Sequence, residues 1–210
     1  MIRPIFLALL AAPALAEASP TLTYTACQSS ADRAALGATL RSDGWQVVGE
    51  RDREAFVEAM TDGLTIALNN AAAADLDWAA ARSQAADLSN TMIRAAGLGV
   101  LITLYRAEGA ALSVLEADEN GAAYIHCLYA GPADDAVREM LETMGPMDAA
   151  AGIRSKNEEY GTYTVRTTKP GGPIEVTDMQ VSIYADPGAV VAGEAPSVEM
   201  GFSSYTFPAR

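Results

Sequence analysis

The two cysteines, Cys27 and Cys127, limit the possible folds more than any other feature of this sequence. If they pair, two segments that are far apart in the chain must lie side by side. The closed loop would contain about 100 residues, which is worth up to ~4–5 kcal/mol in the chain-entropy model. Whether they pair depends on the compartment, because disulfides form and persist in oxidising surroundings.

The N-terminal segment indicates that compartment. MIRPIFLALLAAPALA has one basic residue, Arg3, an apolar run over 5–12 and a small-x-small ending. This layout is typical of a secretory signal peptide and predicts cleavage after Ala16. The run is shorter than the ~20 residues that a membrane span requires. We therefore expect a periplasmic or secreted protein with a Cys27–Cys127 disulfide; two buried free thiols or an intermolecular bridge are the alternatives.

The net charge of the chain restricts its partners. It is −13, and loss of Arg3 with the signal segment removes one positive charge and no acid, leaving −14. Such a surface repels phosphate backbones and anionic lipid. Hydrophobic residues make up 50% of the chain, enough for a core, yet the strongly apolar run lies in the signal segment. We expect no nucleic-acid binding and no membrane insertion of the mature chain, and the partner is an unknown protein or small-molecule ligand.

The first half of the mature chain predicts mainly helices. The alternating segment LTYTAC, 22–27, indicates a strand, and Ser29 with Asp32 resembles a capping box that opens a helix ending before Gly44. WQVV, 45–48, reads as a short strand. Apolar residues then recur at helical spacing in two stretches between Phe56 and Gly97, which predicts two antiparallel helices.

The second half predicts mainly strands. Segments 100–107, 111–117 and 122–130 form a meander, and Asn120-Gly121 is a hairpin signal. Pro132 opens a helix that Gly145-Pro146 ends. The polar stretch 148–161 reads as a linker. Three further strands are predicted, separated by turns rich in proline and glycine, at 163–169, 174–185 and 197–207.

These elements predict an α+β fold. We expect an antiparallel sheet, made of the meander around 100–130 plus the C-terminal strands, packed on one face against helices and held by one disulfide. Residues 1–16 are assigned to the signal peptide and 17–147 to an α+β core domain. Residues 148–210 form a β-rich segment of the same domain, although a separate small sheet is the alternative.

His126 is the one histidine of the chain, and it lies next to Cys127 in the strand AAYIHCLYAG. Neighbouring residues of a strand point to opposite faces, so these two side chains cannot form a Cys–His dyad. A zinc site needs three or four ligands, which one histidine and a paired cysteine do not supply. We interpret His126 as part of the scaffold. A Ser–His–Asp triad assembled from distant segments remains open.

Other residues could take part in catalysis or metal binding, but a structural role explains them more simply. The close acid pairs are suited to helix caps, first turns or solvated loops: Asp75/Asp77, Asp134/Asp135 and Glu158/Glu159. Met140, Met144 and Met147 could bind copper through their thioethers, but the first two continue an apolar helix stripe. We therefore assign no catalytic, cofactor-binding or metal residue.

The absence of an assembled catalytic motif favours a non-catalytic function. We expect an exported binding or interaction module. Catalysis would require groups that only folding brings together. Two alternatives stay open: a secreted hydrolase that uses carboxylates or His126, and a methionine-based copper-binding protein. His126 in a pocket beside two acids would favour the hydrolase, whereas an open sheet face with tyrosines would favour binding.

Overall fold

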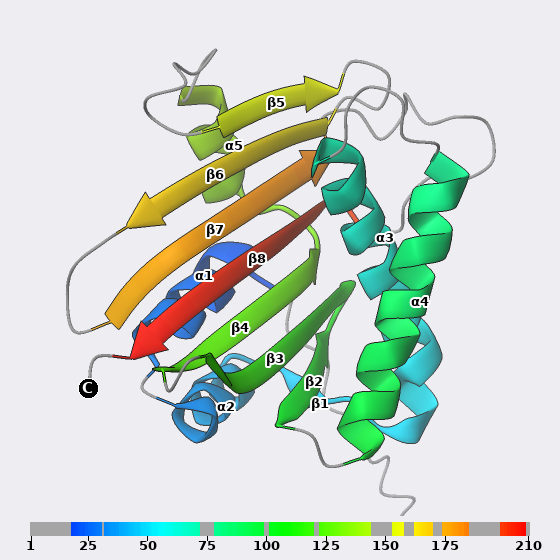
Figure 1. Cartoon of the computed structure of the whole chain (residues 1–210), viewed down its shortest axis with the longest axis vertical. Helices are drawn as coiled ribbons and strands as arrows, with labels where there is room; N and C mark the ends of the chain where they lie inside the picture. The colour runs from blue at the N-terminus through cyan, green and yellow to red at the C-terminus, as the bar shows by residue number, and fades with distance from the viewer. Residues whose placement is uncertain are drawn as a thin grey trace, which may run out of the picture.

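The computed structural model describes residues 18–30, 32–71, 78–98, 101–119, 122–143, 153–157, 162–169, 174–184 and 198–208. Within them the chain forms one eight-stranded antiparallel sheet in the order β1-β2-β3-β4-β8-β7-β6-β5 (Figure 1). The strands are β1 (Gln46–Val47), β2 (Ile102–Ala107), β3 (Ala110–Glu119), β4 (Ala122–Gly131), β5 (Ile153–Asn157), β6 (Thr162–Lys169), β7 (Ile174–Tyr184) and β8 (Met200–Pro208).

The helices of the described chain are α1 (Pro20–Ser29), α2 (Arg33–Ser42), α3 (Arg53–Ala71), α4 (Trp78–Gly97) and α5 (Asp135–Thr143), with a 3-10 turn at Glu50–Asp52. The predicted α+β fold is confirmed. The C-terminal strands extend the first meander, because β8 pairs with β4 over Ile125↔Thr206 to Gly131↔Met200. Among these helices none is both long enough and apolar enough to cross a bilayer.

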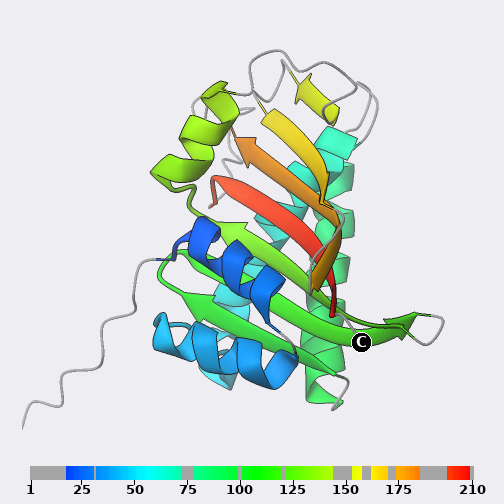
Figure 2. The ribbon, with the colours of Figure 1, turned by 90° about the vertical axis from the view of Figure 1, so that its left-hand side faces the viewer.

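Helices cover both faces of the sheet, whereas the sequence predicted one covered face (Figure 2). The reason lies in β3, where consecutive residues from Ala111 to Val114 are all buried, so that both faces need a cover. We call the side of α1 and α2 the disulfide face; its core contains Leu112, Val114, Cys127, Tyr129 and Phe202. We call the side of α3 and α4 the hairpin face; its core contains Leu104, Ala111 and Ala130.

The disulfide joins helix α1 to strand β4 on the disulfide face. Cys27 and Cys127 are bonded, their Cα atoms lie 6.5 Å apart, and neither residue is exposed to solvent. The predicted bridge is therefore confirmed. The element that carries Cys27 was predicted wrongly as a strand. It is a helix because Ser19 caps it, Pro20 occupies its first turn, and distant contacts outweigh the strand preference of its threonines.

Asp134 fixes the start of α1 against the start of α5. Its carboxylate accepts hydrogen bonds from the Ser19 hydroxyl at 2.8 Å, from the Thr21 amide at 3.1 Å and from the Val137 amide at 3.0 Å. One side chain thus satisfies free amides at two helix N-termini. Burial raises the pKa of Asp134, but these hydrogen bonds outweigh it and hold the pKa below its usual value.

On the hairpin face, α3 approaches the sheet at Gly63. A Cβ at Gly63 would overlap the Cβ of Ala130, and one at Gly201 would lie 3.0 Å from the Gly63 carbonyl oxygen. These two glycines let helix and strand backbones touch. Behind this contact α3 packs on α4, where Asp62 Oδ1 and Arg82 Nη1 form an ion pair at 2.5 Å.

Most of the other predicted helices and strands match elements of the structure, and one predicted linker does not. The helices expected after Asp32 and between Phe56 and Gly97 correspond to α2, α3 and α4, and the short strand at 45–48 to β1. The linker predicted at 148–161 is wrong in part, because β5 pairs there with β6 at the edge of the sheet. The Asn120-Gly121 turn lies outside the described residues.

Candidate functional site

The most distinctive group of side chains on the hairpin face surrounds His126. The Nε2 atom of His126 lies 2.9 Å from the Ser203 hydroxyl oxygen, across the β4–β8 pair. The imidazole stacks on the ring of Tyr205, with centroids 4.0 Å apart and planes 6° from parallel. Tyr124 also contacts Tyr205, and their ring centroids lie 5.9 Å apart. We call Tyr124, His126 and Tyr205 the aromatic ledge.

The alternation predicted for this strand is confirmed. Ile125, Cys127 and Tyr129 are buried in the core of the disulfide face, whereas Tyr124 and His126 lie on the opposite face and are partly exposed. Cys127 is oxidised in the disulfide, so His126 has no thiol partner. In Figure 1 the α3–α4 hairpin lies over one part of this face, whereas the start of β4 and the end of β8, next to the C-terminus, have no helix in front of them.

Burial decides the charge state of His126. It lowers the pKa of the imidazole from 6.5 to about 4, so the ring is neutral at pH 7. A neutral imidazole has one donor nitrogen and one acceptor nitrogen, and either arrangement satisfies Ser203. A general base works best when its pKa is near the operating pH, and a group with a pKa of about 4 is a weak base. His126 is therefore better suited to holding the Ser203 hydroxyl in place than to removing its proton.

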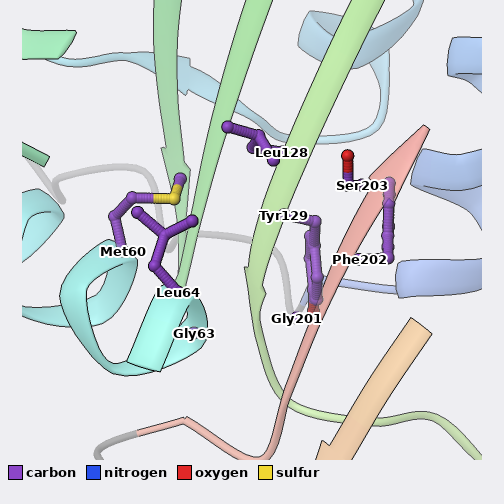
Figure 3. A pocket seen from close by; sticks show the side chains of 8 residues that line it. All are labelled: Met60, Gly63, Leu64, Leu128, Tyr129, Gly201, Phe202 and Ser203. Atoms are coloured by element: carbon purple, nitrogen blue, oxygen red, sulfur yellow. The ribbon is translucent and has the colours of Figure 1, made fainter. Parts of the chain in front are cut away.

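A pocket of about 120 Å³ lies beside the ledge, between α3 and the β4–β8 pair (Figure 3). Met60 and Leu64 reach from α3 toward Leu128 on β4, and Ser203 supplies a hydroxyl. The remaining lining comes from Gly63, Tyr129, Gly201 and Phe202. Because strand residues alternate, the rings of Tyr129 and Phe202 point to the disulfide face, where they stack on each other. We call this space the wedge pocket.

A second, more open groove runs between α2 and the edge of the sheet. Its lining includes Arg33, Arg41, Tyr105 and Glu116, with a volume of about 540 Å³. Arg33 forms an ion pair with Glu116, with 3.6 Å between Nε and Oε2, so part of the positive charge is already neutralised. Among its described residues, this groove contains no stacked rings or hydrogen-bonded polar pair comparable to His126, Tyr205 and Ser203.

The other candidate residues are only partly described. Asp134 caps two helices, and Asp135 is exposed in the first turn of α5, so this acid pair has the predicted structural role. The remaining acid pairs and the side chains of the methionines lie outside the description: Asp75/Asp77, Glu158/Glu159, Met140, Met144 and Met147. Of the described side chains, no three or more of His, Cys, Asp or Glu gather as a metal site requires.

Ser203 and the α3 residues of the pocket are functional candidates that the sequence did not single out. Ser203 meets His126 only because β8 pairs with β4, across 77 positions of sequence. The alternating segment GFSSYTF predicted the strand, but nothing in it predicted the neighbour. Met60 and Leu64 were predicted to belong to the apolar stripe of a helix. Such a stripe does not show where a pocket lies between the helix and the sheet.

Comparisons with models of known protein families, with curated proteins and with solved structures give no match to this chain.

Proposed function

We propose that this protein is an exported binding module, periplasmic or secreted, which binds a small ligand at the aromatic ledge and the wedge pocket. The observation that carries the proposal is the His126–Tyr205 stack with its hydrogen-bonded Ser203, which also lines an apolar pocket. Ligand sites commonly combine apolar walls with a few fixed polar groups, and this site has that composition. Export is supported by the predicted signal peptide and by the disulfide.

The geometry favours binding over hydrolysis. A serine beside a histidine resembles the first two members of a catalytic triad, but that mechanism needs a histidine that accepts a proton at working pH. Burial lowers the pKa of His126 to about 4, which works against this role. Stacking on Tyr205 also occupies one face of the imidazole. The hydrolase remains the competing function, and the same experiment distinguishes the two.

The direct test is a saturation-transfer NMR screen of the mature chain from Glu17 against a library of small neutral and charged compounds. We expect hits that weaken at least tenfold in the double variant Tyr205→Ser with Leu64→Phe, which removes the stacked ring and fills the pocket. Leu22→Ser is the matched control, because Leu22 is 60% exposed on α1, on the opposite side of the sheet. Hits should bind this control as they bind the wild type.

Two results would count against the proposal. Hits that bind this double variant as well as they bind the wild type would place binding elsewhere on the molecule. Hits that are converted to a product by the wild type, but not by Ser203→Ala, would establish the hydrolase instead. Mass spectrometry of the compounds after incubation detects that conversion.

Export has its own test, which is intact mass spectrometry of the protein secreted by its host. We expect a mass that begins at Glu17 and alkylation of both cysteines only after reduction. A full-length intracellular chain with free thiols would contradict export and the disulfide together.

A further inference from the structure

We infer that the wedge pocket selects a small neutral molecule that carries an aromatic ring and one hydrogen-bonding group, as phenol does. This inference rests on the proposed function, since it names the ligand class of the same site. Four properties of the pocket carry it: its size, the absence of charge in its described lining, its one positioned hydroxyl, and the shape and chemistry of its walls.

Size limits the ligand to about one ring. The pocket holds about 120 Å³, and a cavity of roughly 150 Å³ lined by apolar side chains is known to accept benzene. A single ring with one small substituent therefore fills the space. Larger ligands would have to extend out of the pocket.

Charge is disfavoured inside the pocket. The described lining contains apolar side chains, backbone and one serine, and no ionised group. His126, whose Nε2 atom lies 2.9 Å from the Ser203 hydroxyl, is neutral at pH 7 because burial lowers its pKa. A carboxylate or ammonium would lose its water without gaining a partner of opposite charge, which disfavours its binding.

The polar end of the ligand is set by Ser203. Its hydroxyl is held by the Nε2 atom of His126 at 2.9 Å, and a hydroxyl keeps further donor or acceptor capacity after one such bond. The hydroxyl lines the pocket, so a ligand O–H or carbonyl can complete its hydrogen bonding. A ligand that buries Ser203 without a hydrogen bond to it leaves a polar group unsatisfied and therefore binds more weakly.

The walls favour a flat ring. One wall is the sheet, at Leu128 and Gly201, and the other is the α3 stripe of Met60 and Leu64 (Figure 3). A ring can lie between a flat sheet and a helix without forcing them apart. The Met60 thioether, which Figure 3 shows on the pocket side of α3, adds a favourable sulfur–aromatic contact.

The test is a set of titrations of the mature chain with phenol, benzene and benzoate, followed by amide chemical shifts. We expect phenol to bind at least tenfold more tightly than benzoate. Ser203→Ala should weaken phenol about fivefold, as expected for one lost hydrogen bond, and change benzene less than twofold. Leu64→Phe fills the pocket and should weaken both. Leu88→Ala, at an exposed site on α4, is the control that should change neither.

The outcomes separate this inference from the proposed function. Benzoate binding as tightly as phenol, or phenol binding unchanged by Ser203→Ala, would overturn the ligand class. If phenol fails while other library compounds shift the ledge amides, the ligand class is wrong and the binding function stands. If no compound shifts those amides, the ligand class and the proposed binding function are both wrong. Thermal melting of each variant shows that it is folded.

Discussion

The two faces of the sheet differ in the contacts that hold them, although they share the same strands. On the disulfide face, Cys127 is bonded to α1 and a double helix cap at Asp134 holds that helix in place. On the hairpin face, the neighbouring residue His126 stacks on Tyr205 beside a pocket. Because consecutive strand residues point to opposite faces, one strand can anchor the fold with one side chain and present a site with the next.

This division explains how a partly open face can keep its geometry. A binding site needs side chains that are held by rigid elements. β4 and β8 lie near the centre of the sheet and are covered from behind by α1, which the disulfide attaches. The difference between the faces can be tested by substitutions that affect one face at a time.

The largest effect is expected at the disulfide. Replacing both partners, as Cys27→Ala with Cys127→Ala, should lower the free energy of unfolding by about 3–5 kcal/mol, because the bridge closes a loop of about 100 residues. Urea unfolding measures the loss, and reduced wild type should show a similar one. A loss below about 1 kcal/mol would mean that α1 is held mainly by other contacts.

The next effect is expected on the hairpin face. Gly63→Ala should lower the free energy of unfolding by about 1–3 kcal/mol, because the new methyl group meets Ala130 and must push α3 from the sheet. Gly97→Ala is the matched control. No atom lies within 4 Å of a Cβ there, so this change should be neutral or stabilise α4 by up to about 1 kcal/mol. Equal effects would show that α3 does not rest on this contact.

A smaller effect is expected at the helix caps of the disulfide face. Asp134→Ala should cost about 2 kcal/mol, one cap for each of two helices, whereas Asp135→Ala should cost under about 1 kcal/mol. Since the folded-state pKa of Asp134 is lowered, its contribution is present above about pH 4 and is lost as the pH falls through the folded value. Unfolding measured at pH 7 and pH 3 should therefore show the gap between variant and wild type narrowing in acid.

The smallest effect at neutral pH is expected at His126, where the signature is pH dependence. The folded-state pKa is about 4 and the unfolded value is about 6.5, so the unfolded chain binds a proton first. Stability should fall as the pH drops from 6.5 toward 4, and His126→Gln should reduce that slope. NMR titration of the imidazole should give a midpoint near 4. A midpoint near 6.5 would mean that the ring is exposed and that the ledge is not packed as described.

Local patterns were sufficient for much of this fold. Capping signals identified α2, helical periodicity identified α3 and α4, and strand and turn patterns identified β2, β3, β4, β6, β7 and β8. Export chemistry paired Cys27 with Cys127. Alternation alone also separated His126 from Cys127. These features depend on residues that are close in sequence, or on a pair that had no competing partner.

Features that depend on distant partners were missed. The threonines of α1 favour a strand, and the helix forms because Asp134, more than a hundred residues away, bonds its first turn. β5 is polar because an edge strand need not bury both faces, so its sequence resembles a linker. The Ser203–His126 contact follows from the register of β4 with β8, which no local pattern specifies.

The most direct test of the difference between the faces is an amide chemical-shift map of the mature chain with a bound library compound. We predict that the shifted amides lie on β4, β8 and α3, around Leu64, His126 and Ser203, while α1 and α2 stay unchanged. Shifts concentrated along α2, around Arg33 and Arg41, would contradict that assignment and move the binding site to the disulfide face.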